Sequence, residues 1–203
     1  MKQSDFKQRL REIERADKHG LASCSIELAF RLVSDFPDRG RAWFELALAT
    51  YPVARYDDAL CALRRGLRLC PQNKRHIVYG QFGNLYSQKG EFRRAETWYR
   101  KALAGDPRDA TWHILLGALL AGAGRLREAE ALHRTATRCP KGAIDEAYLN
   151  LGLVLRAQQR YEEARSCFRK ALKLTPSYKE ARQHLHDMKQ VLILTRKRTP
   201  RKR

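Results

Sequence analysis

The fold is decided by residues 79–107, which read YGQFGNLYSQKGEFRRAETWYRKALAGDP. Gly83 lies where a first helix needs a small residue, and Ala95 lies near the start of a second helix that could approach it closely. Pro107 then ends the second helix, because proline has no N–H to donate to the preceding turn. The segment therefore predicts a helical hairpin.

The same markers recur along the chain with a period near 34 residues. Prolines fall at Pro37, Pro71, Pro107, Pro140 and Pro176, and alanines fall at Ala59, Ala95, Ala129 and Ala164. An aromatic residue or a leucine lies three places before each alanine, at Tyr56, Phe92, Leu126 and Tyr161. Small residues of the expected first helices are Ala47, Gly83, Gly117 and Gly152. Because several independent markers recur with the same period, the sequence predicts an all-α solenoid of stacked hairpins.

These residues resemble the tetratricopeptide repeat family. In the third repeat the resemblance is carried by Tyr79, Phe82, Gly83, Tyr86, Phe92, Ala95, Tyr99, Ala102 and Pro107. The fourth repeat is looser, since His113 stands where the aromatic residue belongs, and the first repeat is degenerate enough to be an atypical N-terminal cap. The resemblance covers roughly residues 6–178, and it is specific for the fold while saying little about function.

The expected domain organisation follows from this spacing. Residues 1–194 are expected to form the array, with repeats at about 6–39, 40–73, 76–109, 110–142 and 145–178. A capping helix is expected over about 179–194, because Ala181, Leu185, Met188 and Leu192 form one apolar stripe. The basic tail, residues 195–203, contains no apolar residue and is expected to be disordered.

The resemblance implies a concave groove lined by the first helices of successive repeats. The residues at groove positions are Phe44, Leu48, Ile77, Gln81, Asn84, Gln88, Ile114, Ala118, Leu149, Asn150, Leu153 and Arg156. Amides suit a peptide ligand, since they both donate to and accept from a main chain, and apolar neighbours suit a helix or an extended segment. The competing interpretation is that many of these apolar side chains only pack within the array.

One subclass of the family holds the C-terminal carboxylate of chaperones with basic groove residues. In the frame of the last three repeats, the two decisive positions hold Glu146 and Asn150 instead of cations. The frame of the first three repeats holds Ile77 and Gln81 there. The sequence therefore argues against a chaperone clamp.

The chain is strongly basic, with 41 Lys and Arg against 22 Asp and Glu, a formal net charge of +19 and a pI near 10.2. A charge of this size favours polyanions such as nucleic acid or ribosomes. Candidate polyanion-binding residues are Arg64, Arg65, Arg93, Arg94, Arg100, Lys101, Arg196, Lys197, Arg198, Arg201, Lys202 and Arg203. The competing interpretation is a solvated face, because cations late in a helix also complement its dipole.

No motif for catalysis, metal binding or a cofactor stands out. His113 and His133 fall at positions that face the core, so they are expected to be satisfied structural histidines, and His184 and His186 cannot share a helix face. The five cysteines are widely spaced, which favours reduced thiols. A cytoplasmic location is expected, or a nuclear one in a eukaryotic cell.

Three functions remain open from the sequence. The first is a non-enzymatic scaffold or adaptor that holds a peptide or helix of a partner protein in the groove. The alternative is a nucleic-acid- or ribosome-associated protein that uses its second helices and its tail. The third is a subunit that only completes a larger assembly, with interfaces on both faces.

Overall fold

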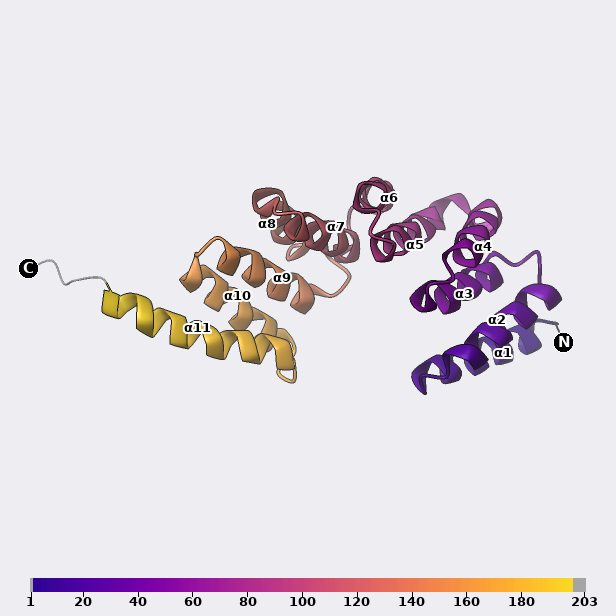
Figure 1. Ribbon diagram of the computed structural model, residues 1–203, viewed down its shortest axis with the longest axis horizontal. Coiled ribbons are helices and arrows are strands. Elements are labelled where there is room, and N and C mark those ends of the chain that lie inside the picture. Colours follow the sequence, from indigo (N-terminus) through magenta and orange to yellow (C-terminus); the bar gives the residue numbers. More distant parts are fainter. Residues whose placement is uncertain (1, 199–203) are drawn as a thin grey trace, which may run out of the picture. The chain divides into compact units, whose positions relative to one another are not determined.

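The computed structural model describes residues 2–198, and the regular elements among them are helices (Figure 1). In chain order they are α1 (Lys2–Lys18), α2 (Ala22–Asp35), α3 (Gly40–Thr50), η1 (Tyr51–Val53), α4 (Tyr56–Leu69), η2 (Gln72–Lys74), α5 (Arg75–Gln88), α6 (Phe92–Gly105), α7 (Ala110–Gly122), α8 (Leu126–Ala136), α9 (Ile144–Ala157), α10 (Tyr161–Leu174) and α11 (Lys179–Arg198). The all-α prediction is confirmed. Within this described part of the chain, no helix has the length and apolar character that a membrane span requires.

The chain divides between Gly105 and Asp106 into two compact units. Unit 1, residues 1–105, contains the hairpins α1–α2, α3–α4 and α5–α6, which pack in that order. Unit 2, residues 106–203, contains α7–α8 and α9–α10, with α11 packed on α10. The first hairpin begins at Lys2, four residues before the expected first repeat, and α5 and α9 each begin one residue before theirs. The repeat bounds and one continuous array over residues 1–194 stay predictions.

Each hairpin turns with the same backbone geometry. One residue adopts the left-handed conformation, with φ between 62° and 77°. The N–H of the next residue donates to the carbonyl five places back, at 2.9 to 3.1 Å, which is the pattern of a Schellman helix end. The left-handed residues are Gly20, Ala54, Gly90, Gly124 and Gln159. This shared turn reverses the chain so that the second helix returns along the first.

A close contact between the paired helices depends on the missing side chain of glycine. A Cβ atom added at Gly117 would lie 2.6 Å from Cε1 of His133, and one added at Gly152 would lie 2.5 Å from Cε1 of Phe168. The ring of Tyr99 occupies the same place against Gly83. We call these three positions the glycine notches. They confirm that the small residues of the first helices allow the second helices to approach.

A second recurring contact fixes where a first helix begins. The carbonyl of the proline that ends one repeat accepts a hydrogen bond from the side chain six residues later. The pairs are Trp43 Nε1 with Pro37 at 2.7 Å, His113 Nε2 with Pro107 at 2.9 Å, and Arg182 Nη2 with Pro176 at 2.7 Å. His113 thus replaces the tryptophan ring in the fourth repeat, and α11 begins in the register of a further first helix.

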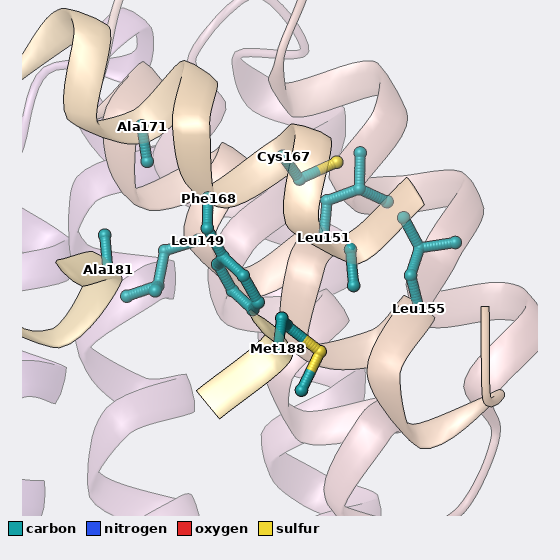
Figure 2. Packing of buried hydrophobic residues seen from close by; sticks show 9 residues of the cluster. Leu149, Leu151, Leu155, Cys167, Phe168, Ala171, Ala181 and Met188 are labelled. Atoms are coloured by element: carbon teal, nitrogen blue, oxygen red, sulfur yellow. The ribbon is translucent and has the colours of Figure 1, made fainter. Parts of the chain in front are cut away.

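The last helix covers the apolar side of the fifth hairpin. Figure 2 shows Ala181 and Met188 of α11 beside Phe168 of α10 and Leu149 of α9, within one cluster of buried residues. Leu185 is half-buried against the same cluster. The predicted capping stripe is confirmed for these three positions, and the side chain of Leu192 lies outside the described residues.

The end of α11 differs from the prediction. The helix continues to Arg198, four residues past the expected end at Leu194, so residues 195–198 are helical and not disordered. The sequence offers no helix breaker before Pro200, which disfavours a helical conformation at the residue that precedes it. Cations in a last turn also complement the helix dipole. The remaining tail, residues 199–203, lies outside the described residues.

Candidate functional site

In unit 1, two neighbouring first helices carry a stripe of side chains each. Arg41, Phe44 and Leu48 of α3, with Tyr51 of η1, recur every three or four residues and so share one face. The same spacing joins Lys74, at the end of η2, to Ile77, Gln81, Asn84 and Gln88 of α5, the next first helix. The Tyr51 hydroxyl donates to Oε1 of Gln81 at 3.5 Å, which places the two stripes side by side. We call this surface the α3–α5 strip.

A hydrogen-bonded network orders the amides of the strip. Asn84 Nδ2 donates to Oε1 of Gln81 at 3.1 Å, and the Tyr99 hydroxyl of α6 donates to Oδ1 of Asn84 at 2.7 Å. Burial raises the pKa of Tyr99 to about 12 and also raises the pKa of Tyr51, so both phenols keep their protons at neutral pH. Since both amide oxygens accept from neighbours, the N–H groups of Gln81 and Asn84 hold the hydrogen-bonding capacity that a ligand could use.

A pocket of about 360 Å³ lies at one end of the strip. Its lining is Gly40, Arg41, Phe44, Gly66, Leu69, Cys70, Pro71, Lys74, Ile77 and Val78. The Arg41 guanidinium lies 5.3 Å from the centre of the Phe44 ring and pairs with the buried carboxylate of Glu45 at 2.5 Å. Ile77 keeps 38% of its surface exposed, which is a high fraction for a large apolar side chain.

The predicted groove residues of unit 1 are therefore accessible. Phe44, Leu48, Gln81 and Asn84 are half-buried, and Ile77 and Gln88 are exposed. The carbonyl of Gln88 accepts from the Tyr56 hydroxyl at 3.4 Å, which holds the end of α5. Whether these residues bind a partner stays a prediction.

In unit 2, the prediction of an accessible groove position is wrong for two residues. Ile114 and Leu149 are only 3% and 8% exposed, because each packs into an apolar cluster between helices. Leu153 is half-buried against the cluster around Phe168, and Ala118 is exposed. The apolar part of this face is mostly used for packing, as the competing interpretation of the sequence held.

The polar groove residues of unit 2 are also engaged. Asn150 Nδ2 donates to the carbonyl of Glu146 at 3.1 Å, within its own helix. Arg156 Nη1 donates to Nδ1 of His184 on α11 at 3.1 Å. Burial and the Arg156 charge lower the pKa of His184, which therefore stays a neutral acceptor. His186 is exposed, so the two histidines lie on different faces as predicted.

Some cations of the second helices contact neighbouring side chains, and others are exposed or half-buried. Arg94 pairs with Glu91 at 2.6 Å, Arg100 pairs with Glu96 at 2.7 Å, and Lys101 lies 4.3 Å from the centre of the Trp98 ring. Arg64 and Arg93 are exposed and Arg65 is half-buried. The side chains of Arg196, Lys197 and Arg198 are not described, and Arg201, Lys202 and Arg203 lie outside the described residues.

The buried histidines differ from the prediction in one respect. Both are buried, and Nε2 of His113 bonds the Pro107 carbonyl, while its Nδ1 has no hydrogen-bond partner among the described residues. His133 is 1% exposed, and neither ring nitrogen has a hydrogen-bond partner among the described residues. Burial, with a smaller contribution from His113, lowers the pKa of His133 to about 4. The prediction of a satisfied histidine is therefore wrong for His133.

Sequence analysis missed four contributors to the strip, namely Arg41, Tyr51, Lys74 and Tyr99. Three of them continue the stripes that were recognised, since Arg41 and Lys74 precede Phe44 and Ile77 by three residues and Tyr51 follows Leu48 by three. Extending each stripe by one turn would have found them. Tyr99 was assigned to the helix contact, and its hydroxyl reaches Asn84 only because the ring fills the glycine notch.

Comparison with known proteins identifies the repeats. A tetratricopeptide repeat model matches residues 81–144, and a second one matches residues 145–178. Human tetratricopeptide repeat protein 7B is 28% identical over 160 residues, which are 74% of this chain and 19% of that protein. The chain thus corresponds to about a fifth of the length of this relative.

Solved structures agree on the fold. The chain resembles TTC0263, a thermophilic repeat protein of Thermus thermophilus, with a TM-score of 0.65 and 19% identity over 90% of this chain and 98% of the other. It also resembles the first repeat domain of Spaghetti (RPAP3) bound to the HSP90 peptide SRMEEVD, with a TM-score of 0.56 and 24% identity over 60% of this chain and 95% of that one. The two repeat models, the human relative and the spacing of the hairpins together support a tetratricopeptide repeat protein, and the solved structures agree with that fold.

Proposed function

We propose that this protein is a non-enzymatic scaffold or adaptor that binds a peptide or a helical segment of a partner protein along the α3–α5 strip. Repeat proteins of this fold include one solved with a bound peptide, which supports a protein partner. Unit 2 contributes less to binding in this proposal, because its first-helix side chains are used for packing and for the contact with α11.

The observation that carries the proposal is the polarity of the strip. Gln81 and Asn84 stand half-buried with their oxygens engaged, so they offer N–H groups to a ligand. Main-chain carbonyls of a bound segment are acceptors that match these donors. Leu48 and Phe44 lie beside them on α3 and supply apolar contact area for side chains.

The substitution Gln81→Glu tests this proposal with little change in shape. The carboxylate can still accept from Tyr51 and Asn84, but it has no N–H to donate and it repels carbonyl oxygens. We expect capture of protein partners to fall about tenfold or more, the effect of losing one hydrogen bond and leaving an acceptor unpaired. The measurement is a pull-down from cell lysate, washed at high salt with nuclease and quantified by mass spectrometry.

A matched control is Gln190→Glu, which makes the same change at an exposed position of α11. It should leave the captured proteins unchanged. If Gln81→Glu captures the same proteins in the same amounts as the wild type, the strip does not bind them and the proposal fails.

The alternative function is polyanion binding, and the cations of α4 favour it. Arg64 is exposed and Arg65 is half-buried, and the acidic residues of α4, Asp57 and Asp58, lie in its first turn. The double substitution Arg64→Glu and Arg65→Glu should weaken binding of a labelled RNA, and the affinity of the wild type should fall steeply as salt rises. RNA affinity that survives both changes would remove this alternative.

A further inference from the structure

The pocket at the end of the α3–α5 strip differs from the rest of the strip in its charge. Arg41 and Lys74 belong to its lining, and no carboxylate does. Glu45, the acid that pairs with Arg41, is buried. Lys74 is exposed, and it forms no ion pair with the described residues. The rim therefore carries positive charge at Lys74, whereas the charge of Arg41 is offset in part by Glu45.

A thiol inside the pocket lies close to one of these cations, Lys74. Cys70 belongs to the lining and is half-buried. Burial raises its pKa, and the charges of Arg75 and Lys74 oppose that effect. Of the two cations in the lining, Lys74 thus acts on the interior of the pocket as well as on its rim.

The floor of the pocket is apolar and narrow. Phe44, Leu69, Ile77 and Val78 contribute apolar surface from three helices. A Cβ atom added at Gly40 would lie 3.2 Å from Cβ of Leu69, so α3 and α4 approach closely there and leave little room for a side chain. A volume of about 360 Å³ is near the lower end for ligand pockets, which suits one or two side chains and not a whole helix.

We propose that this pocket binds an acidic anchor of a partner protein, namely an aliphatic or aromatic side chain with flanking aspartate or glutamate residues. The apolar side chain enters between Phe44 and Ile77, and the carboxylates pair with Lys74 and with the exposed part of Arg41. The rest of the segment then extends along the strip toward the N–H groups of Gln81 and Asn84. This inference rests on the proposed function and specifies the chemistry of its ligand.

The cations lie elsewhere than those of the chaperone clamp. In the frames of the first three and the last three repeats, the decisive positions of that clamp hold no basic pair, whereas Arg41 and Lys74 lie at the start of α3 and immediately before α5. The ligand needs side-chain carboxylates, so a free chain terminus is not required.

The test is a selection from a phage library of random twelve-residue peptides, in which the displayed segments have no free C-terminus. Immobilised full-length protein is the target. Peptides that bind are then synthesised with a fluorescent label, and their affinities are measured by anisotropy for the wild type and for Lys74→Glu and Ile77→Ser. Both substituted side chains are exposed, so the fold should persist. Circular dichroism checks this.

We expect the selected peptides to share an apolar residue beside Asp or Glu. Lys74→Glu and Ile77→Ser should each weaken their binding about tenfold, since one removes an attractive charge and the other removes apolar contact area. Matched controls in unit 1 are Lys18→Glu and Val53→Ser, which make the same changes at exposed positions outside the pocket. They should change the affinity less than twofold or so.

Two other outcomes separate the pocket from the proposed function. If selected peptides lack acidic residues, or bind Lys74→Glu and Ile77→Ser as well as the wild type but lose affinity for Gln81→Glu, the pocket inference is overturned and the scaffold proposal stands. If no peptide is selected, or if none depends on Gln81 or on the pocket, both are overturned.

Discussion

Unit 1 and unit 2 fill equivalent glycine notches with different rings. In unit 1, Tyr99 fills the notch at Gly83, and its hydroxyl reaches Asn84 of the α3–α5 strip at 2.7 Å. In unit 2, His133 fills the notch at Gly117 without a hydrogen-bond partner among the described residues. In unit 2 the close contact at the notch therefore contributes only to packing. In unit 1 the same contact also orders a surface amide, that of Asn84.

The difference between the two rings also affects how surface amides are held in each unit. Asn84 is oriented by the phenol that comes through the notch, whereas Asn150 bonds the carbonyl of Glu146 in its own helix. Phe168, in the other notch of unit 2, has no polar atom to offer. The hydroxyl of Tyr99 thus connects the buried contact between the helices of unit 1 to the α3–α5 strip. The substitutions below test this connection in unit 1 and its absence in unit 2.

The largest effect is expected for Phe168→Ala in unit 2. Phe168 is fully buried between Gly152 and the residues of α11 shown in Figure 2. Truncation leaves a cavity, and such changes cost about 3 to 5 kcal/mol of unfolding free energy. Urea denaturation measures the loss, and hydrogen exchange should show it in α9, α10 and α11 before it appears in unit 1.

The matched control for this change is Phe92→Ala in unit 1. Phe92 keeps 58% of its surface exposed at the start of α6. Removing its ring should change the unfolding free energy by less than about 1 kcal/mol. Equal losses for the two variants would contradict the burial that distinguishes them.

The next effect is a loss of stability in acid that depends on His133. Its pKa falls from 6.5 to about 4 in the folded chain, so between these values the unfolded chain binds a proton that the folded chain does not. Stability therefore decreases as pH falls from about 6.5 to about 4, by roughly 3 kcal/mol in total. Urea denaturation at a series of pH values measures this slope.

His133→Phe supplies the ring that the fifth hairpin places in its own notch. This variant should lose that part of the acid dependence and keep the contributions of the other groups. The exposed His19 gives the control, since His19→Asn should leave the slope as in the wild type. An unchanged slope in His133→Phe would show that another group causes the loss.

Unit 1 is expected to respond at the opposite end of the pH scale. The pKa of Tyr99 rises from 10 to about 12 on folding, so its contribution is complete below pH 10 and is lost as pH rises toward 12. The loss amounts to about 2 to 3 kcal/mol. Tyr99→Phe should remove this part of the base dependence, which denaturation at alkaline pH measures as a difference from the wild type.

The same substitution also tests the link between the notch and the strip. Tyr99→Phe keeps the ring in place but leaves Oδ1 of Asn84 without its donor. At neutral pH we expect weaker peptide binding than in the wild type, by about threefold to tenfold. His133→Phe serves as the control, and binding that is unchanged in both variants would mean that the phenol does not order the strip.

The fold could be predicted because each repeat needs the same few residues. A glycine or alanine in the first helix, an alanine in the second and a proline at the end recur because the helix contact and the helix end require them. The end of α11 could not be placed from the tail's charge, since polarity alone does not break a helix. The division between Gly105 and Asp106 has no equivalent marker in the sequence, because the repeat period continues across it.

The candidate site was predicted less completely. Spacing identified Gln81 and Asn84, but it also selected Ile114 and Leu149, whose positions are buried by neighbouring helices. The spacing of residues along a helix shows which of them share a face, but it does not show how deeply that face is buried. The exposure of each side chain depends on which other helices pack against that face. The hydrogen bond from Tyr99 to Asn84 joins two helices of one hairpin, and the repeat pattern specifies only that a ring is present there.

The smallest effect concerns the turns, where both units place a residue with a side chain in a left-handed conformation. Gln159 in unit 2 and Ala54 in unit 1 each have φ of 62°, while three other hairpins use glycine. This conformation costs about 1 to 2 kcal/mol for a residue with a Cβ atom, and glycine loses about 0.4 to 1 kcal/mol through the freedom of the unfolded chain. Gln159→Gly and Ala54→Gly should therefore each stabilise the protein by up to about 1 kcal/mol, and Gly124→Ala should destabilise it by a similar amount. Thermal denaturation measures all three, and a stabilising Gly124→Ala would contradict the view that these turns share one geometry for one reason.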